Sequence, residues 1–360
     1  MHLKKKILFL SPYPSKIVPS QRFRFEQYFP ILSRYYIITQ KTFWDKKGWE
    51  ILFSDKNDFI KLLWLLIKAF GKRFFLLFHL QKYDLIFIHR EVSHLGPPVF
   101  EWIIKYILRK KIIYDFDDAI WLLNYSDKNR ISKFFKSPWK TKYICKWANS
   151  IIAGNSYLAD YAKKYNKNVF VIPTTIDTSY HKNKYKEHKT LTIGWTGTLT
   201  TLKYLNAIVP VLKQLEEKYN LNFLIISNEK PKLNLKFTYK SWCKETEIED
   251  LRKIDIGIMP LYNNIWEKGK CGFKGLQYMA LEIPTIMSPV GVNTEIIEGG
   301  VNGFLANTEQ EWFEKLSLLI ESVELRKKLG EAGRRTVVEK YSVEANKQKY
   351  LDVFNSVLWS

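Results

Sequence analysis

Short apolar runs alternate with amphipathic stretches along the first half of the chain. Each run has the length of a strand, and its nearly continuous apolar character predicts that the strand is buried. The stretches between them, such as residues 20–32 and 97–108, have the spacing of apolar positions that suits a helix packed on one side. The predicted strands are residues 6–11, 35–40, 83–89, 110–116, 150–155 and 169–174. This alternation predicts a parallel sheet with helices on both faces.

The same pattern begins again after a polar segment. Residues 178–189 (TSYHKNKYKEHK) have no apolar periodicity and are expected to form a linker. Further strands are predicted at residues 191–198, 221–227, 255–261 and 284–288, and helices at residues 309–323, 324–341 and 343–358. The chain is therefore predicted to be an α/β protein with two Rossmann-like domains, residues 1–183 and 186–342.

Composition agrees with this organisation. A chain of 360 residues with 46% hydrophobic residues is long enough to bury two cores. Cys145, Cys243 and Cys271 lie far apart and form no Cys-x-x-Cys pair, which argues against a disulfide framework or structural zinc and is typical of a reducing cytosol. The apolar stretch near the N-terminus is only Ile7 to Leu10, so a first strand explains it better than a signal peptide.

Positive charge is concentrated in the first half. Residues 1–185 hold 33 Lys and Arg against 14 Asp and Glu, whereas residues 186–360 hold 24 against 22. Such an imbalance indicates an anionic surface or partner at the first half.

Residues 269–306 are the most informative segment. A basic, glycine-containing loop (Lys270, Cys271, Gly272, Phe273, Lys274) leads into the short helix LQYMAL, the buried strand PTIMS and a loop that opens at Gly291. A strand, a loop and a helix N-terminus in this order direct backbone N–H groups and a positive dipole end at one point, which suits a phosphate.

The segment resembles the nucleotide-sugar half of family 4 (group 1) glycosyltransferases. In that family a Glu-x7-Glu motif precedes Met-Ala-x-Gly-x-Pro, and a Gly-x-x-x-Glu-Ile loop follows. The positions that fall on this pattern are Gln277, Met279, Ala280, Pro284, Gly291 and Glu295. The resemblance implies the GT-B architecture, in which two Rossmann-like domains face each other across a cleft and a C-terminal helix, residues 343–360, crosses back to the first domain.

The sequence departs from the family pattern at three positions. The first motif glutamate, which in the family contacts the donor sugar, falls on Gly269, and the second, which holds the ribose, falls on Gln277. Glu282 replaces the glycine before Pro284. Because an amide can still hydrogen-bond ribose hydroxyls, nucleotide binding survives these changes more easily than sugar recognition does.

The resemblance implies a donor site in the second half. Gly197 and Thr198 lie in the loop that would face the donor diphosphate, and Thr198 stands where the family often has an arginine. The positive charge must therefore come from a lysine, because a leaving nucleoside diphosphate needs its developing charge neutralised. The candidate lysines are Lys203, Lys270 and Lys274, and the other donor-binding candidates are Gly272, Phe273, Gln277, Gly291 and Glu295. The alternative for each lysine is a solvated surface charge.

Three carboxylates follow a predicted strand of the first half. Asp115, Asp117 and Asp118 lie at the edge where α/β sheets bind ligands. The resemblance implies an acceptor-facing residue nearby, so Asp117 or Asp115 is a candidate to deprotonate or orient an acceptor hydroxyl. The alternatives are a metal-binding Asp-x-Asp, which the two-domain pattern argues against, and helix capping with pairing to lysines.

Two arginines follow the first predicted strand. Arg22 and Arg24 lie in the loop that covers the cleft in the resembling family, where an arginine can hold a phosphate through two hydrogen bonds. A capped helix with an exposed basic turn is the alternative.

A basic and aromatic region suggests a membrane surface. Residues 128–146 contain seven basic residues and no acid, with Phe134, Phe135, Trp139 and Tyr143 between them; the basic residues are Lys128, Arg130, Lys133, Lys136, Lys140, Lys142 and Lys146. Such a composition favours binding to anionic lipid headgroups. Residues 59–80 mix a wide apolar face with lysines, and here membrane contact and core packing both remain open.

Together these features predict a glycosyltransferase that moves a sugar from a nucleotide-sugar donor to a lipid-linked or cell-envelope saccharide. The donor is a substrate, and no cofactor or metal is expected; the resemblance favours retention of anomeric configuration. The expected location is the cytoplasmic face of the membrane, with an anionic lipid surface as partner and no nucleic acid. Two alternatives stay open: a catalytically inactive relative that binds sugar nucleotides or a partner, suggested by Gly269 and Gln277, and a nucleic-acid-binding protein that uses the basic half.

Overall fold

The computed structural model describes residues 4–52, 59–122, 137–183 and 190–360. The chain forms two compact units, Met1–Pro173 with Lys347–Ser360 and Thr174–Asn346. The first unit thus ends at Pro173, before the predicted boundary at 183. The reason is that residues 174–183 are held by the second unit: His181 O accepts a hydrogen bond from Arg334, and Asn183 Nδ2 donates to Glu282 Oε2 over 2.9 Å.

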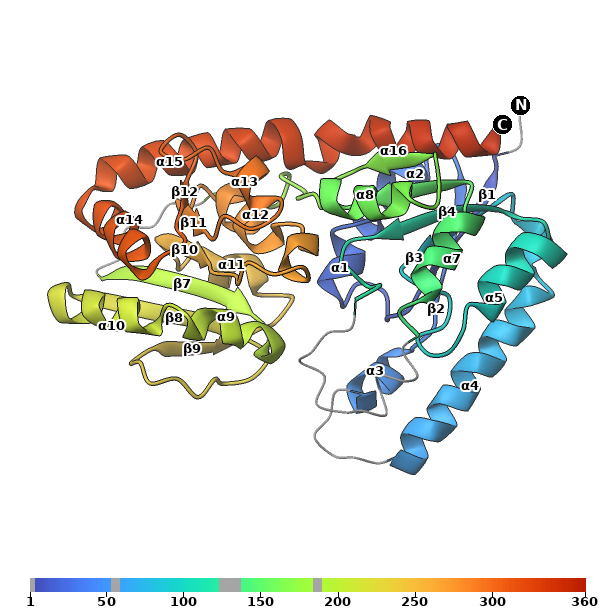
Figure 1. The fold of residues 1–360 in the computed structure, drawn as a ribbon, viewed down its shortest axis with the longest axis horizontal. Helices are drawn as coiled ribbons and strands as arrows, with labels where there is room; N and C mark the ends of the chain where they lie inside the picture. Colours follow the sequence, from blue (N-terminus) through green and yellow to red (C-terminus); the bar gives the residue numbers. More distant parts are fainter. Residues whose placement is uncertain (1–3, 53–58, 123–136, 184–189) are drawn as a thin grey trace. The chain divides into compact units, whose positions relative to one another are not determined.

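The first unit contains a six-stranded sheet in the order β2-β1-β3-β4-β5-β6, and all of its pairs are parallel. Its strands are β1 Lys6–Ser11, β2 Ile37–Thr42, β3 Leu85–His89, β4 Lys111–Phe116, β5 Ser150–Ala153 and β6 Val169–Val171 (Figure 1). Five of the six predicted strands contain one of these, and the prediction at residues 35–40 overlaps β2, so the apolar runs of this half are confirmed as strands. The central strands β3, β4 and β5 are almost entirely buried, as expected for strands covered on both faces.

Helices of very different length flank this sheet. They are α1 Pro19–Arg22, η1 Glu26–Tyr28, α2 Phe29–Leu32, α3 Lys46–Leu52, α4 Phe59–Leu77, η2 Leu80–Lys82, α5 Val99–Trp102, η3 Ile103–Ile107, α7 Lys140–Trp147 and α8 Ser156–Lys163. The single helix predicted over residues 20–32 is wrong, because three short helices lie there. Phe25 leaves the helical region (φ −133°), and Pro30 has no N–H to bond to the carbonyl of Glu26. In the part of the chain that the structure describes, no helix is both long and apolar enough to cross a bilayer.

The last helix, α16 (Val343–Leu358), belongs from Lys347 onward to the first unit, as the fold prediction required. Its Phe354 stacks on Phe87 of β3 with ring centroids 5.8 Å apart, and Phe9 of β1 lies against both rings. Tyr350 Oη donates a 2.6 Å hydrogen bond to Arg24 O. Aromatic packing therefore fixes this helix on the sheet of the first unit.

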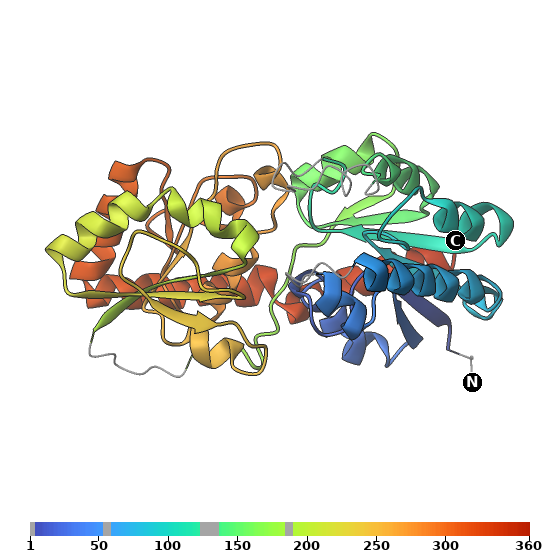
Figure 2. The same cartoon turned by 90° about the horizontal axis from the view of Figure 1, so that it is seen from below.

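The second unit contains another six-stranded parallel sheet, in the order β12-β11-β10-β7-β8-β9 (Figure 2). Its strands are β7 Leu191–Gly197, β8 Leu221–Ser227, β9 Thr238–Ser241, β10 Ile256–Met259, β11 Thr285–Met287 and β12 Phe304–Leu305. Its helices are η4 Leu199–Thr201, α9 Leu202–Asn206, α10 Val209–Lys218, α11 Glu247–Leu251, η5 Glu267–Gly269, α12 Phe273–Ala280, α13 Asn293–Ile296, α14 Glu309–Glu321, α15 Val323–Thr336 and η6 Val337–Tyr341.

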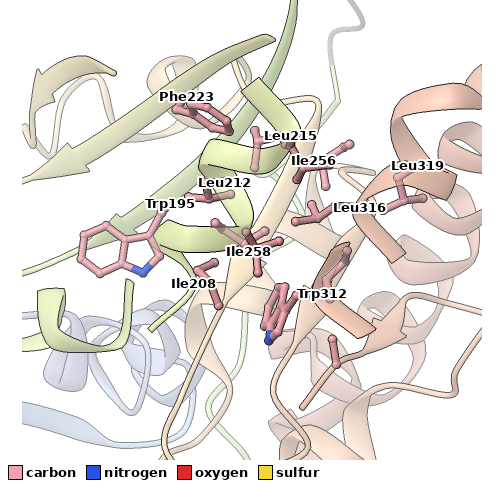
Figure 3. Packing of buried hydrophobic residues seen from close by; sticks show 14 of the residues in the cluster. Trp195, Ile208, Leu212, Leu215, Phe223, Ile256, Ile258, Trp312, Leu316 and Leu319 are labelled. Carbon is pink, nitrogen blue, oxygen red and sulfur yellow. The ribbon is translucent and has the colours of Figure 1, made fainter. Parts of the chain in front are cut away.

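One face of this sheet packs against α10 and α14. Figure 3 shows Leu212 and Leu215 of α10 and Leu316 of α14 meeting Ile256 and Ile258 of β10. Trp195 of β7 belongs to the same cluster and lies at its edge in Figure 3. Trp195 therefore anchors the end of β7, and with it the loop that follows, in the hydrophobic core.

Candidate functional site

In the second unit the strand order reverses between β7 and β10, the point at which open α/β sheets bind ligands. Gly197, the last residue of β7, lies beside the side chain of Lys274 in α12. A Cβ added to Gly197 would stand 2.7 Å from Lys274 Nζ and 2.3 Å from a ring carbon of Trp195. The glycine thus leaves the space in which the Lys274 ammonium lies 4.4 Å from the centroid of the Trp195 ring.

The Lys274 ammonium has little to stabilise its charge. Its Nζ donates to Thr201 Oγ1 over 3.3 Å, and among the described residues it forms no ion pair with a carboxylate. Burial of the ammonium, with added repulsion from Lys270, lowers the pKa of Lys274 to about 7. An anion that reached this nitrogen would favour its charged form, so the position suits a phosphate group.

Helix α12 is tied to the end of β7. Tyr278 Oη accepts a 2.8 Å hydrogen bond from the backbone N–H of Thr196, and the Tyr278 ring is fully buried against Gly257. Burial raises the pKa of Tyr278 well above its usual value, so the hydroxyl stays protonated. This contact holds Lys274, in the first turn of α12, next to Gly197.

Gln277 lies one turn after Lys274 on the same helix. Its side chain is buried, and its Nε2 has no hydrogen-bond partner within residues 4–52, 59–122, 137–183 and 190–360. A buried amide without a partner costs about 1–3 kcal/mol. Gln277 therefore keeps donor capacity that a ligand could use, although its predicted contact with a ribose is not tested by the structure.

Lys203 differs from the two lysines of the loop. Its Nζ lies 3.7 Å from Oε1 of Glu267, a carboxylate that is 1% exposed and that also accepts a hydrogen bond from the hydroxyl of Tyr204. The charge of Lys203 is therefore partly neutralised by a neighbour. The other oxygen of Glu267, Oε2, has no partner in the described parts of the chain.

The loop after β11 closes on the loop before α12. Gly291 has a φ of +55°, and a Cβ there would lie 2.6 Å from Lys268 O, so a larger residue would displace that loop. Asn293 is buried; its Nδ2 donates to Ser288 O over 2.9 Å, and its Oδ1 has no partner among the described residues. Glu295 is exposed on α13.

The structure places the remaining donor candidates around the same loops. Thr198 is exposed, and its N–H donates to Thr201 Oγ1 over 3.0 Å, so Thr198 and Lys274 share one hydroxyl partner. The Lys270 ammonium lies 5.9 Å from the centroid of the Trp266 ring, and Gly272 and Phe273 begin α12. The predicted residues therefore gather at one place, although their roles stay predictions.

In the first unit, Asp115 does not fit the predicted acceptor role. Asp115 lies at the end of β4 and is fully buried, 2.5 Å from Arg24 Nη2 and 2.6 Å from His89 Nδ1. Burial acts to raise the pKa of Asp115, but the neighbouring guanidinium and imidazole hold it below its usual value. A carboxylate closed off in this way cannot reach an acceptor hydroxyl.

The same cluster corrects the prediction for Arg24. Its guanidinium is fully buried and also donates to Ile172 O over 2.5 Å, so Arg24 holds the ends of β4 and β6 and does not bind a phosphate. Arg22 is only partly buried, with its guanidinium 4.9 Å from the centroid of the Phe23 ring, and remains a candidate.

Asp117 is partly exposed, as is Asp118, and both are held by a residue that the sequence analysis missed. Arg90 Nε donates to Asp117 Oδ1 over 2.8 Å, and Arg90 Nη2 lies 3.0 Å from Asp118 Oδ2. Although burial acts to lower the pKa of Arg90, the two carboxylates raise it above its usual value. Arg90 follows β3 with a φ of +60°, a conformation that is costly for an arginine and that concentrates at functional sites.

A signal for Arg90 was present in the sequence. His89 ends the apolar strand β3, and Arg90 and Glu91 directly follow it, as Asp117 and Asp118 follow β4. Adjacent parallel strands bring such residues to one edge, since β3 pairs with β4 and His89 is in register with Asp115. The carboxyl ends of β3 and β4 therefore carry a set of ion pairs. The aspartates alone did not reveal that Arg90 belongs to this set.

The predicted basic surface is only partly observed. Residues 128–136 lie outside the described residues. Lys140 is buried, 2.5 Å from Glu91 Oε2, and donates to Ser93 O over 3.0 Å, so it cannot take part in the predicted binding to lipid headgroups. Lys142 and Lys146 are exposed.

Comparison with known proteins supports the predicted glycosyltransferase resemblance of the second unit. Residues 190–322 match the sequence model of the family described as "Glycosyl transferases group 1". The comparison with curated proteins gave no match.

In the described parts of the chain, no group of three or more His, Cys, Asp and Glu side chains is arranged to hold a metal ion.

Solved structures share the fold at low sequence identity. Sucrose-phosphate synthase from Thermosynechococcus elongatus has a TM-score of 0.70 at 11% identity, covering 98% of this chain and 100% of that one. A glycosyltransferase from Rickettsia africae has a TM-score of 0.70 at 16% identity, covering 99% of each chain. HepE from Anabaena, in complex with UDP-glucose, has a TM-score of 0.68 at 13% identity, covering 98% of this chain and 99% of that one. These structures confirm the predicted GT-B fold of two Rossmann-like units.

Proposed function

Residues 190–322 form a domain of the group 1 glycosyltransferase family, and from that premise we propose that the protein transfers a sugar from a nucleotide-sugar donor to a saccharide acceptor. In this reaction an acceptor oxygen bonds to the anomeric carbon while the bond from that carbon to the diphosphate breaks. The nucleoside diphosphate leaves with the electron pair, and the acceptor proton passes to a base. The proposal requires a cation at the leaving group and a carboxylate near the acceptor.

The observation that carries this proposal is Lys274. Its ammonium lies beside Gly197 at the reversal of strand order, with a lowered pKa and no carboxylate partner among the described residues. Negative charge that develops on the diphosphate as the bond breaks would be stabilised by this ammonium, with Lys270 adding a second positive charge. The proposal includes that these two lysines stabilise the diphosphate without a metal ion.

We propose Asp117 as the group that orients or deprotonates the acceptor. It is the candidate carboxylate with partial exposure, and its partner Arg90 also contacts Asp118, so the guanidinium can keep one ion pair if Asp117 takes a proton. The acceptor is proposed to be a lipid-linked or cell-envelope saccharide reached from the cytoplasmic side of a membrane. Retention of configuration is proposed from the family, and the anomeric signal of the product in NMR tests it.

The first experiment measures donor use directly. A thermal-shift panel of UDP-, GDP-, dTDP- and CMP-sugars identifies the base and the sugar, and single-turnover hydrolysis of the preferred donor then tests catalysis. Binding with slow hydrolysis that depends on Lys274 supports the transferase. The absence of the two motif glutamates favours one rival, a protein that binds the donor without reacting; binding without any hydrolysis or transfer would support that rival.

Gln277→Ala tests how the nucleotide is held. The loss of a neutral hydrogen bond should weaken binding of the sugar nucleotide and of the free nucleoside diphosphate in parallel, by about three- to ten-fold. Isothermal titration measures both dissociation constants, and Gln214→Ala, an exposed glutamine on α10, is the matched control. Gln277→Glu should bind equally well or better. Weaker binding of the sugar nucleotide alone would place Gln277 at the sugar.

A further inference from the structure

Helix α4 is held on the first unit by one face only. Leu65 and Ala69 are buried in a cluster with Phe43 and Trp44, and Arg73 lies two turns beyond Leu65 on the same face. The buried Arg73 guanidinium donates to three carbonyls: Ser11 O at 3.0 Å, Lys41 O at 3.1 Å and Val92 O at 2.8 Å. This face of α4 is therefore bound to the ends of β1 and β2 and to the segment after β3.

The opposite face of α4 is apolar and exposed. Its large exposed side chains are Ile60, Leu63, Trp64, Ile67, Phe74, Phe75 and Phe78, the last lying just beyond the helix end. Ile60 is 81% exposed, and Ile67, Phe75 and Phe78 are each more than 60% exposed. Seven such residues in one helical stretch exceed what scattered surface hydrophobics explain. The alternative that residues 59–80 serve only as core is thereby excluded for this face.

The neighbouring helices also expose apolar residues. Phe70 of α4 stacks on Phe100 of α5 with ring centroids 6.1 Å apart, and both views of the fold show these helices side by side (Figures 1 and 2). Trp102, Tyr106 and Ile107 are exposed on α5 and η3. An apolar hollow lined by Trp102, Trp139, Tyr143 and Trp147, among others, joins α5 to α7.

The charges around this surface identify its partner. Helix α4 carries Lys61, Lys68, Lys72 and Arg73 and no acidic residue. The Lys68 ammonium lies 5.1 Å from the centroid of the Trp64 ring, and the Lys142 ammonium 4.9 Å from that of Tyr143. Aromatic rings with lysines beside them suit the headgroup region of a bilayer, where rings contact acyl chains and ammonium groups reach lipid phosphates. The centres of protein–protein interfaces, by contrast, are depleted in lysine.

We propose that the exposed face of α4, with α5 and α7 beside it, lies in the headgroup region of an anionic phospholipid bilayer. The partner is the lipid surface itself, and this docking does not depend on donor chemistry. The residues of α4 lie outside the basic stretch at 128–146, to which only the α7 part of this surface belongs. In combination with the proposed function, such docking would present the first unit to a lipid-linked acceptor.

The test is cosedimentation of the full chain with vesicles of phosphatidylcholine alone or mixed with phosphatidylglycerol. We expect binding to the anionic vesicles, weakened by salt because the charges are screened over about 10 Å at 0.1 M. The variant Ile67→Gln, Phe75→Gln, Phe78→Gln should lose at least about ten-fold in vesicle affinity, because three side chains no longer enter the interface. Lys61→Gln, Lys68→Gln should lose roughly twenty-five-fold at low salt, since each lysine contributes about five-fold.

Matched controls separate docking from general surface effects. Leu318→Gln, Val323→Gln, Val338→Gln changes three exposed apolar residues of the second unit, and Lys327→Gln, Lys328→Gln changes two exposed lysines there; both should bind vesicles like the wild type. Circular dichroism melts show whether each variant is folded. The proposal is overturned if the folded α4 variants sediment with anionic vesicles as the wild type does. It is also overturned if the wild type ignores vesicles but self-associates through this face in ultracentrifugation.

Discussion

Replacing Lys274 by methionine should lower the rate of glycosyl transfer by roughly ten- to hundred-fold and leave the fold intact. A charge-assisted contact contributes about 1.5–3 kcal/mol, and each 1.4 kcal/mol of transition-state stabilisation corresponds to about ten-fold in rate. Methionine retains the length of the side chain above the Trp195 ring and removes the ammonium. Lys270→Met should show a smaller loss, because the Lys270 ammonium, 5.9 Å from the centroid of the Trp266 ring, is proposed to supply only the second positive charge at the diphosphate.

Steady-state kinetics with the preferred donor measure the effect, and Lys328→Met, an exposed lysine on α15, is the control. A Lys274→Met variant with wild-type turnover would remove this residue from the site. The match of residues 190–322 to the group 1 glycosyltransferase model does not depend on this outcome.

The pH dependence of donor binding provides an independent test of Lys274. Its pKa of about 7 means that the ammonium is mostly charged below pH 7 and mostly neutral above it in the free protein. A bound diphosphate favours the charged form and raises that pKa, so binding takes up a proton when the pH exceeds 7. Donor affinity should therefore fall as the pH rises above about 7, and Lys274→Met should abolish this trend. Titration calorimetry in two buffers of different ionisation heat measures the proton uptake.

Replacing Arg24 by methionine should destabilise the first unit by about 3–5 kcal/mol, because it leaves the buried carboxylate of Asp115 without its guanidinium partner. The free energy of unfolding is measured with denaturant, and Arg34→Met, an exposed arginine, is the control. The double variant Arg24→Met, Asp115→Asn should be more stable than Arg24→Met alone, since the unpaired charge is then absent. A loss below about 1 kcal/mol, as for exposed ion pairs, would show that Arg24 and Asp115 are not buried together.

The same pair has a defined pH signature. The pKa of Asp115 lies below its usual value in the folded protein, so the stabilisation is present above the usual carboxyl pKa and is lost as the pH falls through the lowered value. In Arg24→Met this part of the acid dependence should be reduced. A wild-type acid profile in the variant would contradict the assignment.

The apolar patterns predicted the sheets well because strands of a doubly covered parallel sheet must be apolar throughout. They predicted the helix at 20–32 poorly, because apolar spacing does not reveal the departure of Phe25 from helical geometry or the hydrogen bond that Pro30 cannot donate. The predicted domain boundary lies within the polar stretch 178–189, whereas residues 174–183 are attached to the second unit by Arg334 and Glu282, which lie far along the chain. Contacts of that kind leave no local trace.

The candidate donor site was predictable in part, because several of its residues are close together in the chain. Lys270, Lys274 and Gln277 lie within one continuous loop and helix, so their spacing alone placed them together. Glu267 also belongs to this stretch, but its burial depends on Tyr204 and Lys203 from another helix. In the first unit, Asp115 and Asp117 are two residues apart in sequence but lie in different environments, because β4 ends at Phe116 and Asp117 lies beyond the strand, where the alternation of sides no longer applies.

By itself, the sequence determined the α/β class, the two Rossmann-like units and the neighbourhood of Lys274, because these follow from apolar periodicity and from residues close together in the chain. Only the tertiary structure decided which charges are buried in pairs, as with Arg24 and Asp115, and which apolar residues are exposed, as on α4. An amphipathic pattern shows that a helix has an apolar face but not what covers it, and α4 is apolar on two faces. Burial and pairing are properties of residues that meet across long chain distances, and these were visible only once the chain was folded.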